Sequence, residues 1–263
     1  MFFPYIGNKR TEMSHIEPFI NLDNIDYIVE PFCGSCSFSL FVYNEYLRDK
    51  NKKLKFRCND IEERLIAIFN DVKKGNIEDY LNYGKSVQKL DMEEKKKISK
   101  KYLENIHNTD KENLLRYFYI ACSTFKSFTM FMPRDVNRKY DLSKKQVIMT
   151  EFCKSKDVKF ICSEYKKIFD KYRENKNALL FIDPPYLNSF NVKYDTYYDK
   201  NIDVSSYYVD IKNLLKNAKC KVIVVINNIC LMNDYYKDFI KCIYGKTYQT
   251  YKTKTEHMIL TNF

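Results

Sequence analysis

Short apolar runs alternate with helical patterns in the first part of the chain, and this alternation restricts the fold more than any other feature of the sequence. The run over 27–30 reads as a buried strand, and a turn and a helix over 37–47 follow it. A second strand over 54–58 leads into a helix over 62–72. Parallel strands need a crossover helix between them, so this order predicts a parallel sheet of the Rossmann type.

The same alternation resumes near the C-terminal end. We expect strands over 158–162, 178–182 and 221–226, with helices over 164–172 and 204–215. A helix near 235–243 and terminal strands around 247–251 and 257–260 complete the expected order.

The stretch between these two parts has a different character. Residues 74–113 are polar and helical without strand-like alternation, and a helix over 114–125 follows. Residues 128–147 mix aromatic with basic side chains and are expected to form an exposed loop or hairpin. The sequence therefore predicts an α/β domain over 1–73 and 151–263 that is interrupted by a mostly helical insertion over 74–150.

Positive charge is concentrated in the middle of the chain. The formal net charge is +11, and the segment from Asp71 to Glu174 holds 24 Lys and Arg against 16 Asp and Glu, which is +8 of that total. A basic middle between nearly neutral flanks favours a polyanionic partner such as nucleic acid. A solvated lysine-rich surface would give the same count, so composition alone leaves both interpretations open.

The nine cysteines are scattered and odd in number, which is typical of unpaired thiols in a reducing compartment. Cys33 and Cys36 have the spacing of a metal or redox pair, but no second Cys or His pair completes a zinc site, so we expect no metal. The N-terminal residues do not resemble a signal peptide, and the apolar run over 222–226 is too short to span a bilayer. We therefore expect an intracellular protein that acts where its nucleic-acid partner is found.

The sharpest local signal is Asp183-Pro184-Pro185-Tyr186, which follows the apolar run over 179–182. A strand of a doubly wound sheet delivers its C-terminal residues to the edge where ligands bind. Two successive prolines remove two N–H donors, which leaves nearby carbonyls free to accept hydrogen bonds from a ligand. A plain turn, in which the carboxylate caps a helix and the tyrosine packs, is the simpler alternative.

These residues suit a reaction at the amino group of adenine. The lone pair of that nitrogen is delocalised into the ring, so the amine is a poor nucleophile. Two acceptors, the Asp183 carboxylate and the Pro184 carbonyl, can hold its two hydrogens and favour a more tetrahedral nitrogen. Tyr186 would stack on a base that has been flipped out of the duplex.

Three further motifs suit a nucleoside cofactor. Glu30 to Ser37 lies where the first strand turns into its helix, so Gly34 permits close approach and Glu30 can attract an ammonium group. Asp60 ends the second strand, where an acidic side chain can bind ribose hydroxyls or simply cap the next helix. The segment Tyr5 to Lys9 combines an aromatic, a glycine and a lysine, and it can cover the cofactor or be a fraying end.

In this order the motifs resemble those of the Dam-like DNA adenine methylase family, especially its short phage members. Tyr5 to Lys9, Pro31 to Gly34 with Ser37, Asn59-Asp60 and Asp183 to Tyr186 are similar to its N-terminal, Phe-x-Gly, ribose-binding and catalytic motifs. The closing stretch 256–262 resembles its terminal strand. The resemblance implies a Rossmann-like class I methyltransferase sheet, S-adenosylmethionine as the methyl donor, double-stranded DNA as partner, and target recognition by the insertion.

The resemblance also implies site residues. The catalytic set is Asp183, Pro184, Pro185 and Tyr186. The implied cofactor-binding set is Tyr5, Gly7, Lys9, Glu30, Pro31, Phe32, Gly34, Ser37, Asp60, Ile61, Ser163 and Tyr165. The candidates for DNA contact are Arg116, Lys126, Arg134, Asn137, Arg138 and Lys139.

The sequence departs from the family in two places. Ser163-Glu164-Tyr165 stands where members commonly carry an Asp-Phe pair beside the cofactor adenine. The stretch 132–140 lacks the glycine-containing pattern of members that read GATC, so GATC is not predicted as the target. Arg134 or Arg138 can read a guanine edge or contact phosphate, and phosphate contact is favoured for most of the basic residues.

Three functions remain open from sequence: a DNA adenine methyltransferase, an RNA methyltransferase, and a degenerate fold that only binds nucleic acid. Related glutamine methylases carry Asn in place of the catalytic Asp, which argues against a protein substrate. The intact Asp183 and Asp60 argue against a degenerate fold. Oligomeric state, and a role in restriction–modification, genome protection or regulation, are left open.

Overall fold

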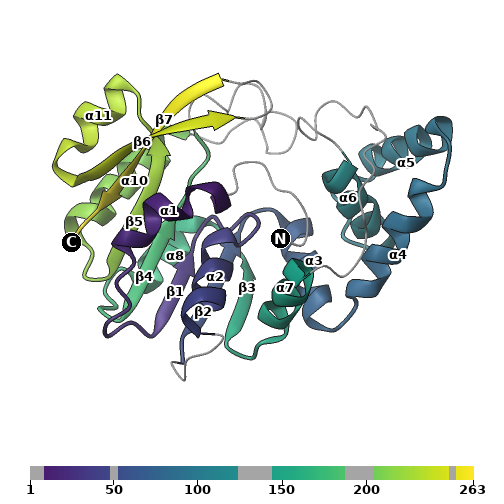
Figure 1. Cartoon of the computed structure of the whole chain (residues 1–263), viewed down its shortest axis with the longest axis horizontal. Coiled ribbons are helices and arrows are strands. Elements are labelled where there is room, and N and C mark those ends of the chain that lie inside the picture. The colour runs from purple at the N-terminus through teal and green to yellow at the C-terminus, as the bar shows by residue number, and fades with distance from the viewer. Residues whose placement is uncertain (1–8, 48–52, 124–143, 187–203, 249–252) are drawn as a thin grey trace.

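The computed structural model describes residues 9–47, 53–123, 144–186, 204–248 and 253–263, which fold around a twisted seven-stranded sheet (Figure 1). The strand order is β3-β2-β1-β4-β5-β7-β6. Their bounds are β1 Tyr27–Glu30, β2 Lys55–Asp60, β3 Val158–Cys162, β4 Ala178–Ile182, β5 Lys221–Asn227, β6 Ile240–Tyr248 and β7 Thr253–Thr261. This confirms the predicted α/β class.

The first five strands are parallel, and β7 pairs antiparallel with both β5 and β6. Strand β1 lies between β2 and β4, so the chain leaves it on one side toward β2 and β3 and returns on the other to β4 and β5. This reversal of strand order creates a crevice at the carboxyl ends of the strands, where open α/β sheets bind ligands.

Helices cover both faces of the sheet, because successive side chains of a strand point to opposite faces. In β4, Leu179 and Phe181 join the core beneath α2 (Ser37–Val42) and α3 (Glu63–Lys73). Leu180 and Ile182 join the opposite core, beneath α8 (Tyr165–Tyr172) and α10 (Val204–Asn217). All five residues of β4 are buried, which explains its continuous apolar sequence.

The short helical turns of the chain complete the two faces. Before β1 come η1 (Arg10–Glu12), α1 (Met13–Ile16) and η2 (Glu17–Phe19), and η3 (Tyr43–Leu47) extends α2. Between β5 and β6 lie α11 (Cys230–Tyr236) and η4 (Lys237–Phe239). Figure 1 shows the β6–β7 hairpin beside α10 and α11, at the opposite end of the sheet from β3.

The predicted helical character of 74–113 is confirmed by α4 (Ile77–Gln88) and α5 (Met92–Glu104), and α6 (Lys111–Ser123) follows. These three helices stand apart from the strands, with α3 and α7 (Lys144–Lys154) between them and the sheet (Figure 1). Arg64 of α3 docks them, because its buried guanidinium donates to the Tyr102 hydroxyl at 2.6 Å and lies 5.2 Å from the Tyr117 ring centroid.

Two secondary-structure predictions were wrong. The helix near 235–243 is replaced by α11, which ends at Tyr236, and by β6, which begins at Ile240. Pairing with β7 overrides the local helical pattern there, and a register shift between Ile240 and Cys242 keeps Tyr244 on the inner face. The loop or hairpin predicted over 128–147 ends too late, because α7 already begins at Lys144.

Across the described part of the chain, every helix is too short or too polar to traverse a lipid bilayer.

Candidate active site

The loops that follow β1, β2 and β4 meet at the carboxyl edge of the sheet and bring the predicted motifs together. The loop after β1 turns through left-handed backbone at Gly34 (φ 46°) and at Cys36 (φ 54°). Glycine adopts this conformation without steric cost, which explains its place in the turn. The Gly34 N–H donates to Oδ2 of Asp60 at 2.9 Å, so the first and second motifs are directly bonded.

Asn59 ties three loops of this edge together. Its side-chain amide donates to the Pro31 carbonyl at 2.8 Å and to the Ser163 carbonyl at 2.9 Å. Its own carbonyl accepts from the Cys33 N–H at 2.7 Å. The side-chain oxygen Oδ1 is buried without a hydrogen-bond partner among the described residues, which leaves an acceptor at this edge.

Asp60 is buried at the end of β2 and accepts N–H donors with both oxygens, from Gly34 and from Glu62 at 3.1 Å. Burial raises the pKa of Asp60 to about 6, although these hydrogen bonds oppose the shift. The next residue, Ile61, is 50% exposed. An exposed isoleucine beside a buried carboxylate leaves an apolar surface open for a ligand.

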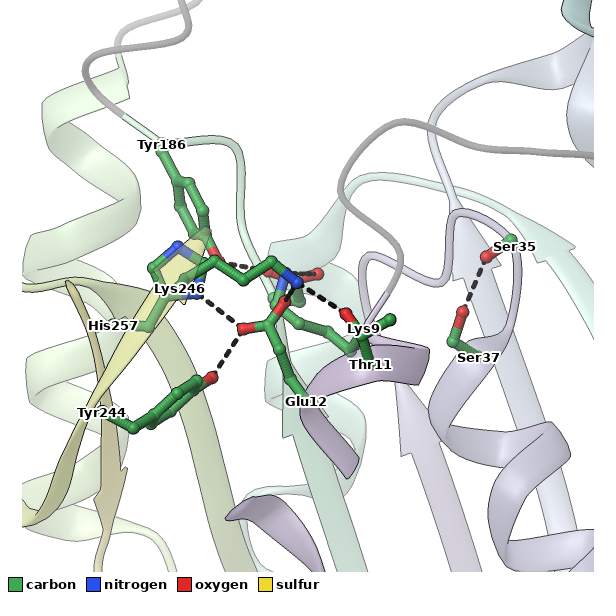
Figure 2. A network of polar contacts seen from close by, with 10 residues as sticks. Lys9, Thr11, Glu12, Ser35, Ser37, Tyr186, Tyr244, Lys246 and His257 are labelled. Atoms are coloured by element: carbon green, nitrogen blue, oxygen red, sulfur yellow. Dashed lines mark hydrogen bonds and ion pairs between the residues drawn. The ribbon is translucent and has the colours of Figure 1, made fainter. Parts of the chain in front are cut away.

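Glu30 ends β1, and its carboxylate is buried and accepts the Ser39 N–H of α2 at 2.7 Å. Burial raises the pKa of Glu30 to about 8, because a charged carboxylate is poorly solvated there. The carboxylate thus caps a helix and would also gain from a cationic neighbour. Beside it, the hydroxyls of Ser35 and Ser37 lie 2.8 Å apart (Figure 2).

An aromatic group borders the predicted adenine side of this edge. Phe32 stacks on Tyr165 with ring centroids 5.2 Å apart, and Tyr207 of α10 meets both rings edge-on. The Tyr165 hydroxyl donates to Asp210 at 2.7 Å. Sequence reasoning missed Tyr207, because its place beside Phe32 depends on how α10 packs and not on any local motif.

Asp183 lies at the end of β4 with 21% of its side chain exposed. The Lys9 ammonium bonds Oδ2 at 2.6 Å, and the Tyr186 hydroxyl donates to Oδ1 at 3.1 Å. Burial raises the pKa of Asp183 above its usual value, although the nearby charge of Lys9 opposes this. The carboxylate therefore carries one donor on each oxygen at the carboxyl edge of the sheet.

The residues after Asp183 are held from below. The Tyr208 hydroxyl of α10 donates to the Pro185 carbonyl at 3.2 Å. Tyr186 is mostly buried, with the Lys9 ammonium 5.1 Å from its ring centroid and the His257 ring 5.3 Å away. Figure 2 shows Lys9 and Tyr186 approaching from different elements toward one point.

Sequence reasoning also missed four residues beside Lys9, namely Glu12, Tyr244, Lys246 and His257, which form a bonded group (Figure 2). His257 had been noted only as part of the terminal strand. A buried His and a buried Glu in otherwise apolar positions were the available signal.

Most of the predicted DNA contacts lie outside the described residues, as do Tyr5 and Gly7. These contacts are Lys126, Arg134, Asn137, Arg138 and Lys139. Arg116 is described and is only 8% exposed, since its guanidinium pairs with Glu112 on the same helix. In this arrangement Arg116 offers little open positive charge, and its role stays a prediction.

Among the residues that the structure describes, no group of three or more His, Cys, Asp or Glu side chains is placed to hold a metal ion.

Comparison with known proteins links these features to a family. A family model described as D12 class N6 adenine-specific DNA methyltransferase matches residues 5–255. The type II methyltransferase M.FokI of Planomicrobium okeanokoites is 25% identical over 193 residues, which cover 70% of this chain and 28% of that protein. The chain thus spans little more than a quarter of that relative's length.

A crystal structure from Listeria monocytogenes, described as a class I S-adenosylmethionine-dependent methyltransferase, aligns with 95% of this chain and 58% of its own at 8% identity and a TM-score of 0.43. The family match covers all four motifs and nearly the whole chain, so it confirms the resemblance seen in the sequence. The chain belongs to the D12 class N6 adenine-specific DNA methyltransferase family.

Proposed function

We propose that the protein is a site-specific DNA adenine methyltransferase, which transfers a methyl group from S-adenosylmethionine to the N6 amine of a flipped-out adenine in double-stranded DNA. The observation that carries the proposal is the Asp183 carboxylate, which stands at the carboxyl edge of the sheet with Lys9 and Tyr186 on its two oxygens. Family membership supports the reaction type. The likeness to a type II methyltransferase supports a role in restriction–modification.

Asp183 would hold the target amine. An adenine amine offers two hydrogens, so one of them can displace Lys9 or Tyr186 from the carboxylate, while the Pro184 carbonyl takes the other. Acceptors on both hydrogens draw the nitrogen toward a tetrahedral geometry and free its lone pair. Once released from Asp183, the Tyr186 ring is available to stack on the base.

The residues at the ends of β1 and β2 suit S-adenosylmethionine, which supplies an electrophilic methyl group on its sulfonium. Asp60 and the unpartnered oxygen of Asn59 offer acceptors for ribose hydroxyls. Ile61 and the Phe32–Tyr165 stack offer apolar surface for the purine. The buried Glu30 carboxylate would attract the ammonium of the methionine part.

The insertion over 74–150 would recognise the DNA target, and the parts over 1–73 and 151–263 would bind the cofactor and carry out the transfer. The positive charge concentrated between Asp71 and Glu174 supports a polyanionic partner on this side. The enzyme would then act in the cell wherever its target DNA is found. RNA offers the same amine chemistry, so the test includes it.

The test is expression of the wild type and of Asp183→Ala in cells whose DNA lacks N6-methyladenine, followed by sequencing that detects methyladenine. We expect methylation at one recurring sequence with the wild type and none with Asp183→Ala, because the variant cannot hold the amine. Purified protein is assayed in parallel on duplex DNA, single-stranded DNA and RNA with methyl-labelled cofactor.

Asp170→Ala is the matched control, since it removes an aspartate whose side chain is 75% exposed on α8. It should methylate DNA like the wild type. Calorimetry with S-adenosylmethionine checks that Asp183→Ala remains folded and binds the cofactor. Methylation of RNA alone, or full activity of Asp183→Ala, would refute the proposal.

A further inference from the structure

A buried carboxylate, Glu12, stands behind the catalytic loop at the end of η1. It is 2% exposed, and three side chains of the β6–β7 hairpin bond to it (Figure 2). The Tyr244 hydroxyl donates to Oε2 at 2.6 Å, and Nδ1 of His257 lies 2.6 Å from the same oxygen. The Lys246 ammonium bonds Oε1 at 2.8 Å.

The hairpin presents these three donors together because of its register. Tyr244 pairs directly with His257 across the two antiparallel strands, so both side chains leave the same face. Lys246 lies two residues further along β6 and shares that face. Burial alone would raise the pKa of Glu12, but hydrogen bonds from His257 and Lys246 and the nearby charge of Lys9 hold it well below the usual value. The carboxylate is therefore charged, and Nδ1 of His257 carries the hydrogen that it donates.

Glu12 is coupled to Lys9 through the backbone. The Glu12 N–H donates to the Lys9 carbonyl at 2.9 Å, which closes the short turn η1. Lys9 is the residue before η1, and its side chain reaches Asp183. Anchoring Glu12 to the hairpin thus determines where the Lys9 ammonium begins its approach to the catalytic carboxylate.

Glu12 is coupled to Tyr186 through His257. The His257 ring meets the Tyr186 ring edge-on at 5.3 Å, and the bond to Glu12 fixes the orientation of the imidazole. Tyr186 in turn donates to Asp183. Both donors on the catalytic carboxylate are therefore backed by the same buried residue.

We propose that Glu12 is a positioning residue for methyl transfer, which fixes Lys9 through η1 and Tyr186 through His257, so that both partners of Asp183 are held ready for exchange with the adenine amine. The inference rests on the proposed function, because it assigns a role within that reaction. Glu12 lies outside the predicted cofactor loops, so it should affect turnover and not cofactor affinity.

The test compares Glu12→Gln and His257→Asn with the wild type on duplex DNA that contains the methylated sequence. An amide offers only one acceptor oxygen to three donors, so Glu12→Gln should release the hairpin from η1. His257→Asn keeps an N–H donor for Glu12 but removes the ring behind Tyr186. We expect kcat to fall about ten-fold or more in both, since small misplacements of reacting groups have large effects. The Kd for S-adenosylmethionine, measured by calorimetry, should stay within about three-fold.

Tyr244→Phe removes one donor and keeps the charge pairs, so it decides the matter if Glu12→Gln fails to fold. It should lower kcat by a smaller factor, again without weakening cofactor binding. Thr11→Ala is the control, because it deletes an exposed hydroxyl bonded to Lys246 at 2.7 Å and leaves Glu12 intact. Its kcat should match the wild type.

An active wild type with unchanged kcat in folded Glu12→Gln, His257→Asn and Tyr244→Phe would overturn the inference and leave the proposed function standing. A loss of kcat that only follows a loss of cofactor affinity or of folded protein would also overturn it, because it would show a structural role. A wild type that is inactive on all DNA would overturn the proposed function itself, and the inference with it.

Discussion

Two buried carboxylates, Glu30 and Asp60, dominate the electrostatics of the cofactor edge at the residue scale. Burial raises the pKa of both, to about 8 and about 6, because the sheet and its loops shield them from water. Neither has a cationic side chain among its printed hydrogen-bond partners, since backbone N–H groups of Gly34, Ser39 and Glu62 supply the donors. Such carboxylates lower the stability of the protein without ligand and gain from a cationic or hydroxyl-rich ligand.

The Glu30 carboxylate should make stability fall with rising pH. In the folded protein its pKa is about 8 instead of about 4.5, so between these values the unfolded chain ionises first and unfolding becomes easier. Glu30→Gln should flatten the decrease in Tm that the wild type shows between about pH 5 and pH 8. Differential scanning fluorimetry without cofactor measures it.

The difference between the two proteins should be small at about pH 5, where Glu30 is protonated in the folded state, and should grow toward pH 8. A constant offset at every pH would contradict the assignment of the shift to Glu30. Asp60 adds a similar decrease at lower pH, which both proteins should share.

At the scale of elements, one buried ion pair connects the sheet to the helical insertion. Glu62 precedes α3 and pairs with Arg64 at 2.5 Å, and both side chains are mostly buried. Arg64 also bonds the Tyr102 hydroxyl of α5 and the Ile106 carbonyl after it. Since Glu62 donates its N–H to Asp60, a short path leads from the cofactor edge to the insertion.

Removing Arg64 should therefore destabilise the protein. Arg64→Met leaves the Glu62 carboxylate buried without its partner, which costs about 3–5 kcal/mol of unfolding free energy. Urea denaturation measures the loss, and hydrogen exchange should show faster opening of α5 and α6. Arg173→Met is the control, because its guanidinium is exposed and its acidic neighbours lie 4.0 and 3.9 Å away.

The control should change stability by less than about 0.5 kcal/mol, as exposed pairs contribute little. Equal losses in the two variants would show that the Arg64 cluster does not hold the insertion in place.

At the scale of the whole molecule, charge and architecture divide the chain in the same way. The parallel sheet gathers the catalytic and cofactor motifs at one edge, and the net charge of +11 comes mainly from the middle of the sequence. A polyanion bound through this region would release counterions, so its affinity would depend steeply on salt.

Binding to duplex DNA should weaken about a thousand-fold or more between about 50 and 200 mM salt, if six or more phosphates are contacted. Replacing Arg134, Arg138 and Lys139 together with Gln should make this salt dependence shallower by up to about three contacts. Fluorescence anisotropy with labelled duplex measures it. The matched variant replaces three exposed lysines of α8, namely Lys166, Lys167 and Lys171, and should keep the slope of the wild type.

The amino-acid sequence alone was sufficient for the strands and for the catalytic motif. β1, β3 and β4 lie where their apolar runs predicted them, because a strand buried on both faces must be apolar throughout. The Asp183 motif could be predicted for the same reason, since the end of such a strand lies at the ligand edge. The prediction failed at 235–243, where pairing with a distant strand decided between helix and strand.

Only the tertiary structure decided which polar groups meet. Glu12 and His257 are 245 positions apart in sequence, and neither position carries a pattern that names the other. Lys9 and Asp183 are 174 positions apart and bond only because η1 folds against the end of β4. Periodicity records which side of an element faces the core, whereas the partner of a buried charge is set by how the elements pack, and that information is not local.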